Sequence, residues 1–424
     1  MKKRNIFKVT AFSTALAVSL IGATVGTIAS ASSAARSPRL TLSGATTGVT
    51  LNLMYGSSGP AETAAINAAA TAWGTSSGNT VTVTNASNLS QQLDQGFAGG
   101  SPPDIFYLSS GQLETFAKQG DLLPYASQAA PASAFYPALV KAYTYNKTWY
   151  CVPKDFSNLA LEINTTMWHA AGLTNANLPT TWAKLLFDAK KLTRNGVAGL
   201  DIGNTLDRIG AFFAENGGSY MNKKGTGFAF NSKQNIAALK FVQSMAKKGY
   251  LKFPAQQSAG WAGEAFGLGK AAMATEGNWI TGAMTSSYPT IKWEAVPMPA
   301  GPKGKKGTLT FTNCWGIAAQ TKYSAAAVNF VKFLSSAAQE VTFANAFGVL
   351  PGRIAAANLY AQQNPSMAAF IQGAKYAMPQ VNTVAFPTVQ AAFDSKVLGL
   401  ANGSSNPVTM LNQLQRNAQA LLRP

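Results

Sequence analysis

One stretch organises the chain: Phe266-Gly-Leu-Gly-Lys-Ala-Ala-Met-Ala-Thr-Glu-Gly-Asn-Trp-Ile-Thr-Gly282. Gly267 and Gly269 indicate a turn, and the apolar residues 271–274 are enough for one buried strand. A second turn then ends in Gly277-Asn278-Trp279, before a helix. Because ligands of open α/β sheets sit outside the carboxyl ends of the strands, Asn278 and Trp279 are candidate binding residues. A core position is the alternative for Trp279.

The segment after residue 48 alternates between strand and helix patterns. Residues 49–55, 80–84 and 105–108 favour strands, and residues 61–73 and 89–97 have helical spacing. Strand, helix, strand, helix, strand predicts an α/β fold with a parallel, doubly wound sheet. A chain of 424 residues also exceeds the size at which one core stops growing, so two lobes are expected.

Short motifs in one consistent order resemble the extracellular sugar-binding proteins of ABC transporters, that is, family 1 of the extracellular solute-binding proteins, which includes maltose-binding protein. The motifs are Pro103-Asp104-Ile105 with Gly120-Asp-Leu-Leu-Pro124, Asn146 to Pro153 with Leu159 to Asn164, Leu178-Pro-Thr-Thr-Trp182, Glu215-Asn-Gly-Gly218, Gly348 with Leu350-Pro-Gly-Arg353, and Phe266 to Trp279. Each motif alone is weak, but their order is specific.

The resemblance implies the type II periplasmic-binding-protein fold, in which two α/β lobes joined by hinge strands close on a ligand. It implies a lobe 1 of residues 49–153 plus 315–360 and a lobe 2 of residues 154–314 plus 361–424. Helices expected at 324–334, 337–347 and 407–422 would cover the sheets. Residues 1–31 are interpreted as a signal peptide and residues 32–48 as a flexible tether.

The resemblance also implies a sugar site at the strand ends, with aromatic platforms and hydrogen-bonding groups beside them. Trp279, Trp315 and Phe386 are the expected platforms, and Asp155 and Gln112 would bind hydroxyl groups. The remaining candidates are polar or aromatic residues of the strand-end loops: Tyr55, Ser57, Ser110, Asn216, Asn278, Asn313 and Arg353. The small, neutral sequence 108–112 departs from maltose-type proteins, so the resemblance does not imply maltose itself.

Cys151 and Cys314 are the only cysteines in the sequence. By the same resemblance, both lie on adjacent strands that cross between the lobes. Export makes a disulfide between them possible, and we expect it to tie the hinge. Two buried free thiols are the alternative.

The N-terminal segment and the basic composition indicate where the protein works and which partners it has. A basic segment at residues 2–8, an apolar run at 9–28 and Ala29-Ser-Ala31 predict a secreted protein at the outer face of the membrane, although an uncleaved anchor is the alternative. Loss of residues 1–31 lowers the net charge from +18 to +14. Because the basic residues are dispersed, no nucleic-acid partner is expected. The sixteen carboxylates and single histidine instead suggest work in acid, with no loss of stability down to about pH 3.

Catalytic motifs are absent from the sequence, and no metal site, cofactor or enzymatic activity is expected. The single histidine, His169, belongs to no zinc-spaced cluster, and there is no P-loop or G-x-S-x-G elbow. The predicted function is the binding component of an ABC sugar importer, a monomer with a carbohydrate ligand and permease membrane subunits as partners. The alternatives are a secreted carbohydrate-active enzyme, with Glu276 as the candidate acid, and a binding protein for a non-sugar solute.

Overall fold

The computed structural model of the protein describes residues 41–422. Every element described below belongs to one compact unit that begins at Leu40. The predicted signal peptide and the first part of the predicted tether lie outside the described residues. The end of that tether is hydrogen-bonded to the folded unit: the Ser43 amide donates to Ser324 Oγ at 2.8 Å, and Asn79 Nδ2 donates to the Thr46 carbonyl at 2.9 Å. A free tether would have to end before Ser43.

The first sheet contains the strands predicted near the N-terminus. Its order is β12 (Asn313–Ile317), β3 (Ile105–Ser109), β1 (Thr50–Tyr55) and β2 (Thr80–Asn85). β1 pairs in parallel with β2 and β3, as expected from the strand and helix order. β12 arrives from far along the sequence and pairs antiparallel with β3, so the sheet is mixed.

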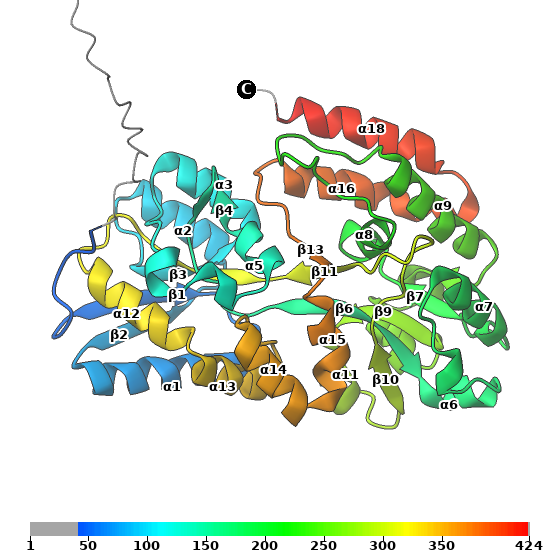
Figure 1. The fold of residues 1–424 in the computed structure, drawn as a ribbon, viewed down its shortest axis with the longest axis horizontal. Helices are drawn as coiled ribbons and strands as arrows, with labels where there is room; N and C mark the ends of the chain where they lie inside the picture. Colours follow the sequence, from blue (N-terminus) through cyan, green and yellow to red (C-terminus); the bar gives the residue numbers. More distant parts are fainter. Residues whose placement is uncertain (1–40, 423–424) are drawn as a thin grey trace, which may run out of the picture. The chain divides into compact units, whose positions relative to one another are not determined.

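Two groups of helices cover this sheet. α1 (Pro60–Ser77) contacts α12 (Ser324–Leu334) and α13 (Ala337–Phe347), while α2 (Leu89–Ala98) and α3 (Ser110–Gln119) lie on the opposite face (Figure 1). α1 begins with proline at its first position and ends at Gly78, whose φ of 70° suits a residue without a Cβ. Asn88 caps α2 by accepting the Gln91 amide hydrogen. Local capping therefore fixes these helix ends.

The second sheet is larger and mixed. Its order is β13 (Ala377–Met378), β11 (Thr308–Phe311), β6 (Ser157–Asn164), β9 (Met273–Gly277), β7 (Leu200–Ile202) and β8 (Leu251–Lys252), with β10 (Trp293–Val296) also paired to β6. β6 is antiparallel to β9, β10 and β11, whereas β7 is parallel to β8 and β9. β11 and β12 follow each other in sequence but belong to different sheets, so the chain crosses between the sheets at Thr312 (Figure 1).

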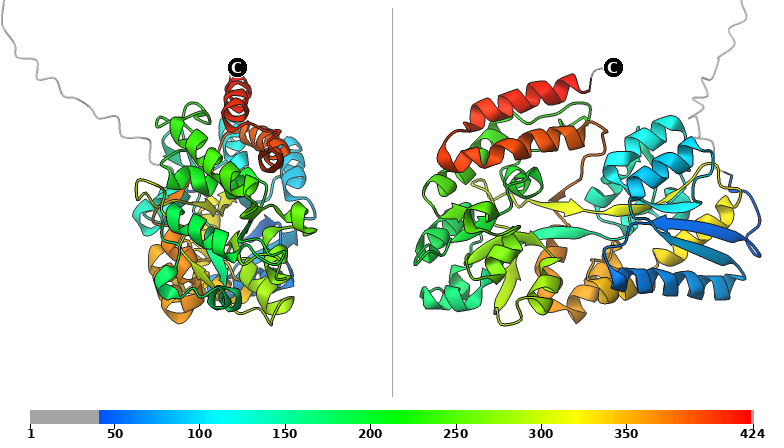
Figure 2. Two further views of the ribbon diagram at one scale, coloured as in Figure 1. Left: turned by 90° about the vertical axis from the view of Figure 1, so that its right-hand side faces the viewer. Right: turned by 180° about the vertical axis from the view of Figure 1, so that it is seen from behind.

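Several helices surround the second sheet. They are α7 (Trp182–Leu192), α8 (Leu206–Glu215), α9 (Lys233–Lys247), α10 (Ala262–Gly267), α11 (Ile280–Ser286), α16 (Phe386–Val397) and α18 (Pro407–Ala420). α16 and α18, both near the end of the chain, pack on each other, and α18 also contacts α9 (Figure 2). The expected helices at 324–334 and 337–347 have the predicted bounds, and α18 ends two residues earlier than expected.

The strand expected at residues 271–274 is shifted in the structure. β9 spans Met273–Gly277, so Glu276 lies inside a strand rather than in a turn. Pairing with β6 fixes this register, with Leu159 opposite Gly277 and Ile163 opposite Met273. An acidic residue such as Glu276 is not expected inside a buried strand from the sequence alone. In the structure, Arg208 and Trp279 donate hydrogen bonds to its carboxylate. Tertiary partners thus overrode the local pattern.

Three apolar cores hold these layers together. One lies around β1, β3 and β12 and a second around β6, β7 and β9. A third joins α5 (Pro137–Ala142), α11, α14 (Ile354–Gln363) and α15 (Ala368–Gly373) beside the crossing strands. The shorter elements are α4 (Ala126–Ala129), β4 (Thr144–Tyr145), β5 (Thr148–Trp149), α6 (Thr165–Ala170) and α17 (Gly399–Asn402), with 3₁₀ turns at Ala132–Ala134, Asn175–Asn177, Pro254–Gln257 and Pro365–Met367. Within residues 41–422, no helix has the length and apolar character to cross a membrane.

Candidate functional site

A pocket of about 190 Å³ opens between the ends of the two sheets. One wall is the turn from β3 into α3, at Ser109, Ser110 and Gly111. The other wall comes from elements around the second sheet: Asp207 and Tyr220, residues 309–311 of β11, residues 378–381 from the end of β13 onward, and Phe386, Pro387 and Gln390 of α16. The pocket therefore lies where the carboxyl end of β3 faces the second sheet, which is where ligands of open α/β folds bind.

Aromatic rings line and extend the second wall. Phe386 packs against Tyr220, with ring centroids 5.4 Å apart. Phe311, also in the pocket wall, packs edge-to-face with Trp279, with ring centroids 5.7 Å apart. Trp279 is 36% exposed, unusual for so large an apolar ring, and it continues the aromatic surface beyond the pocket. Such faces suit the C–H surfaces of a sugar ring.

A buried carboxylate and a guanidinium group hold the Trp279 ring. Glu276 Oε2 accepts from Trp279 Nε1 at 3.0 Å and from Arg208 Nε at 3.0 Å, and it pairs with the second Arg208 nitrogen at 2.8 Å. The Arg208 guanidinium also lies over the indole, 4.9 Å from its ring centroid. Three donors on one carboxylate oxygen fix the position of both side chains.

Local sequence places these groups together. Asp207 and Arg208 lie in the first turn of α8, directly after β7, while Glu276 lies in β9, the strand next to β7. Asp207 lines the pocket and accepts from Gln390 Nε2 at 2.6 Å, which ties α8 to α16. The pocket and the Trp279 cluster are therefore adjacent parts of one surface.

Burial controls the titration of these carboxyl groups. Loss of hydration raises the pKa of Glu276, although Arg208 partly opposes the shift. Burial likewise raises the pKa of Asp207, against the Gln390 hydrogen bond. The pKa of Glu162 in β6 is raised well above its usual range by burial and then by the charge of Glu276. The Glu162 carboxylate accepts the Glu276 amide hydrogen at 2.9 Å.

The structure brings three predicted site residues to this surface: Ser110, Trp279 and Phe386. Trp315 and Tyr55 instead lie in the first core, both 0% exposed. Their side chains alternate inward from β12 and β1, and both rings pack edge-on against Tyr107. Period-two alternation turns both rings inward, so neither lines this pocket, and the platform at Trp315 and the ligand contact at Tyr55 stay predictions.

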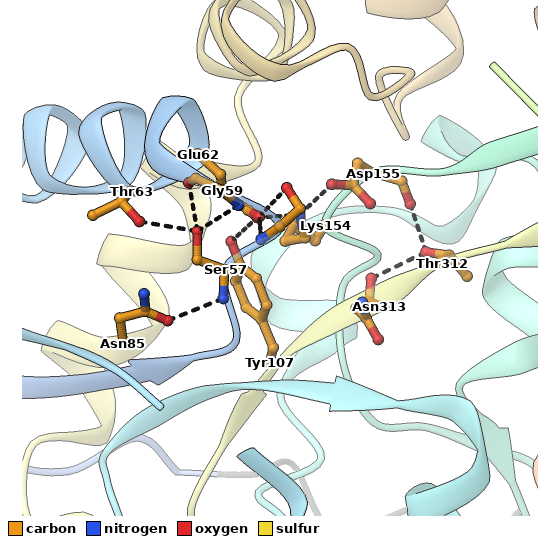
Figure 3. A network of polar contacts seen from close by, with 11 residues as sticks. Ser57, Gly59, Glu62, Thr63, Asn85, Tyr107, Lys154, Asp155, Thr312 and Asn313 are labelled. Atoms are coloured by element: carbon orange, nitrogen blue, oxygen red, sulfur yellow. Dashed lines mark hydrogen bonds and ion pairs between the residues drawn. The ribbon is translucent and has the colours of Figure 1, made fainter. Parts of the chain in front are cut away.

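Ser57, Asp155 and Asn313 belong to a polar network at the crossing strands (Figure 3). Its centre is Lys154, 4% exposed, whose Nζ pairs with Asp155 and, at 3.2 Å, with Glu62 of α1. The Asn313 carbonyl accepts the Lys154 amide hydrogen at 2.8 Å. Ser57, in the β1–α1 turn, bonds to Gly59 of the same turn, to Thr63 of α1 and to Asn85 at the end of β2.

In this network, burial and the pairing of opposite charges shift the pKa values in opposite directions. Burial alone would lower the pKa of Lys154, but Asp155 and then Glu62 outweigh it, so that pKa is raised. Burial would raise the pKa of Glu62, but Lys154 and then Ser58 lower it. Burial raises the pKa of Asp155 despite Lys154. These side chains satisfy one another, so they stabilise the crossing rather than face the pocket.

The other predicted ligands also have structural partners. Asn278 is buried and joins two segments, accepting the Asn158 amide hydrogen at 3.2 Å and donating to the Gly348 carbonyl at 2.9 Å. Gln112 bonds to Ser109 and Ser90 beside the pocket. Asn216 caps the far end of α8 and donates to the Gln234 carbonyl. Arg353 donates to the Ser335 carbonyl and lies 5.1 Å from the Phe135 ring.

The disulfide between Cys151 and Cys314 is confirmed. It links the segment before the first crossing to the start of β12, with Cα atoms 5.8 Å apart, next to the bridge between Pro153 and Cys314. Both residues are buried in the first core.

Arg208, Asp207 and Phe311 are part of this surface but were not predicted from the sequence. A usable signal existed, because Asp207-Arg208 follows the short strand 200–202 and opens a helix, the same position by which Trp279 was recognised. No group of three or more His, Cys, Asp or Glu side chains that could hold a metal occurs among residues 41–422. His169 lies in the last turn of α6, with Nδ1 3.2 Å from the Leu173 carbonyl.

Comparisons with known proteins place this geometry in context. The family model described as "Bacterial extracellular solute-binding protein" matches residues 56–341. A relative in Brucella abortus (strain 2308), whose name marks it as a candidate binding protein, is 24% identical over 79% of this chain and 83% of its own length.

Solved structures share the fold at low identity. The cyclic alpha-maltosyl-1,6-maltose binding protein from Arthrobacter globiformis has a TM-score of 0.78 at 20% identity, covering 88% of this chain and 98% of its own. The sugar-binding protein MalE of Xanthomonas citri has a TM-score of 0.79 at 16% identity, covering 88% and 97%. These likenesses confirm the expected two-lobed periplasmic-binding-protein fold, type II.

Proposed function

The chain belongs to the bacterial extracellular solute-binding proteins, and from that premise we propose that it is the substrate-binding component of an ABC sugar importer. It would capture a mono- or oligosaccharide by closure of two lobes, residues 49–153 plus 315–360 and residues 154–314 plus 361–424. The two sheets and the two cores around them fall almost wholly into separate segments, which supports that division. At the boundary, β12 begins at Asn313 and the third core combines residues of both segments. Hinge closure is the usual motion of such proteins.

The aromatic surface of Trp279, Phe311 and Phe386 carries this proposal. A sugar needs apolar faces for its C–H groups and charged or amide groups for its hydroxyls. Arg208 covers one face of the Trp279 ring, Asp207 lines the pocket beside Phe386, and Ser109 and Ser110 form the opposite wall. Closure would place a sugar ring between the serine turn and the aromatic wall. Related structures bound to cycloalternan and to acarbose support a carbohydrate ligand.

Binding is favoured over glycoside hydrolysis by the occupation of Glu276. Its Oε2 already accepts hydrogen bonds from Arg208 and Trp279, and its side chain is only 1% exposed. A general acid must instead present a proton to the glycosidic oxygen. Glu276 therefore fits the role of holding the aromatic platform.

Titration calorimetry against mono-, di- and trisaccharides, guided by a thermal-shift screen, tests the proposal. A ligand at a hundredfold above its Kd adds about 2.7 kcal/mol to the free energy of unfolding, which raises Tm measurably. We expect Trp279→Ala and Phe386→Ala to abolish heat release. Phe187→Ala, which removes an exposed ring on α7 away from the pocket, is the matched control and should bind normally. If no sugar binds, the carbohydrate assignment is wrong, and if the sugar is converted to products, the protein is an enzyme.

A further inference from the structure

The net positive charge is concentrated in one part of the chain. Residues 49–153 and 315–360 together contain six basic residues (Lys and Arg) and six acidic residues (Asp and Glu). Residues 154–314 and 361–424 together contain 22 basic and ten acidic residues. Six of those ten carboxylates are buried: Asp155, Glu162, Asp188, Asp201, Glu215 and Glu276. The surface of the second segment is therefore more basic than the composition alone indicates.

Two neighbouring helices present much of this charge. Lys233, Lys240 and Lys247 of α9 are exposed and seven residues apart, so they form one stripe along the helix. The stripe is about 21 Å long at 1.5 Å per residue. α9 contains no Asp or Glu. α9 packs on α7 through the stacked rings of Trp182 and Phe241, whose centroids are 4.4 Å apart.

The neighbouring helix α7 adds both charge and an exposed ring. Lys184, Lys190 and Lys191 are exposed, and the one carboxylate of the helix, Asp188, is 1% exposed. Phe187 lies between Lys184 and Lys191 at helical spacing and is 60% exposed, the highest value among the exposed large apolar residues of the described chain. We call this surface of α7 and α9 the basic helical face. It lies at the outer side of the second sheet, beyond β7 (Figure 1).

We propose that the basic helical face docks on an anionic phospholipid bilayer, with the Phe187 ring inserted at the level of the headgroups. Basic side chains near a negative membrane surface are attracted by its potential, and an exposed aromatic ring between them has a favourable place in the interface. No ion pair within 41–422 uses a lysine of α7 or α9, so these charges are available to lipid phosphates. This surface is separate from the pocket and does not depend on its ligand.

Vesicle flotation tests this proposal, with the chain from Leu40 onward because that segment is a compact unit of its own. Phosphatidylcholine vesicles with and without phosphatidylglycerol are compared at low and high salt. We expect binding only to the anionic vesicles, and release at high salt. Equal binding to both compositions, or to neither, would overturn the proposal.

Two variants, each with four lysines replaced by glutamate, test whether binding depends on the basic helical face. Each lysine at an anionic membrane contributes a factor of about five. Replacing Lys184, Lys191, Lys240 and Lys247 by Glu should therefore weaken binding at least a hundredfold. The control reverses four exposed lysines outside α7 and α9: Lys303, Lys322, Lys332 and Lys375. An equal loss in the control would refute a specific face.

A neutral variant tests the inserted ring. Phe187→Ser should weaken binding to anionic vesicles about tenfold without altering its salt dependence. An unchanged partition coefficient would show that the ring does not insert and would overturn the proposed docking mode. Sugar titration of each variant keeps the two sites distinct, since neither set touches the pocket, and melting curves verify the fold.

Discussion

Asp201 should make the protein more stable in acid than at neutral pH. It lies in β7 with its neighbours Leu200 and Ile202 also buried, and it is itself 0% exposed. Gln257 Nε2 donates to one carboxyl oxygen, while the other oxygen has no hydrogen-bond partner. Burial, opposed by the Gln257 hydrogen bond, raises the pKa of Asp201 to about 8.

The direction follows from proton linkage. Between about pH 4 and pH 8, folded Asp201 keeps a proton that the unfolded chain has released, so stability falls as pH rises through that window. At about 1.4 kcal/mol per pH unit, the loss between pH 4 and pH 7 is up to about 4 kcal/mol for this one group. Asp201→Asn removes the titration while keeping an oxygen for Gln257.

Chemical denaturation from pH 4 to pH 7, followed by tryptophan fluorescence, measures this effect. We expect the wild type to lose stability with rising pH and Asp201→Asn to lose up to about 4 kcal/mol less. Asp94→Asn, at an exposed position of α2, is the matched control and should follow the wild type. Parallel stability curves for Asp201→Asn and the wild type would refute the reasoning.

Three further predictions concern the crossing strands and the platform. Replacing both Cys151 and Cys314 by Ala opens a loop of 163 residues and should reduce the free energy of unfolding by about 3–5 kcal/mol. Urea denaturation measures this, and equal midpoints for the variant and the wild type would contradict it. Lys154→Met leaves Glu62 and Asp155 buried without their cation and should cost about 3–5 kcal/mol, partly recovered by adding Glu62→Gln; an additive double mutant would contradict the network. Gly277→Ala would place a Cβ 2.2 Å from the Trp279 ring and so displace the platform, lowering sugar affinity at least about tenfold, whereas Gly282→Ala meets no atom within 4 Å and should bind normally.

Buried carboxyl groups give a physical reason why the protein would stay stable in acid, as its composition suggests. Burial raises the pKa of Asp188 and Asp394 to about 6, and it raises that of Glu215 well above its usual range. Each of these groups is less costly to bury when protonated. Constant or rising stability down to about pH 3 therefore remains the expectation, with acid titration as its measurement.

Sequence by itself determined the first strands and helices and, through the order of the motifs, the fold. Alternation along 49–55 and helical spacing along 61–73 reflect interactions within a few residues, and β1 and α1 formed there. The same local signal placed Trp279 at a strand end. Motif order identified the family, and with it the disulfide.

Only the tertiary structure decided which strand-end residues share a surface. Trp315 and Trp279 look alike in sequence, but pairing of β12 with β3 turned Trp315 into the first core, while the Glu276–Arg208 pair held Trp279 outward. Arg208 and Glu276 are 68 residues apart, so no local pattern could join them. Side-chain direction depends on register and on partners distant in sequence, and these are fixed only when the sheets assemble.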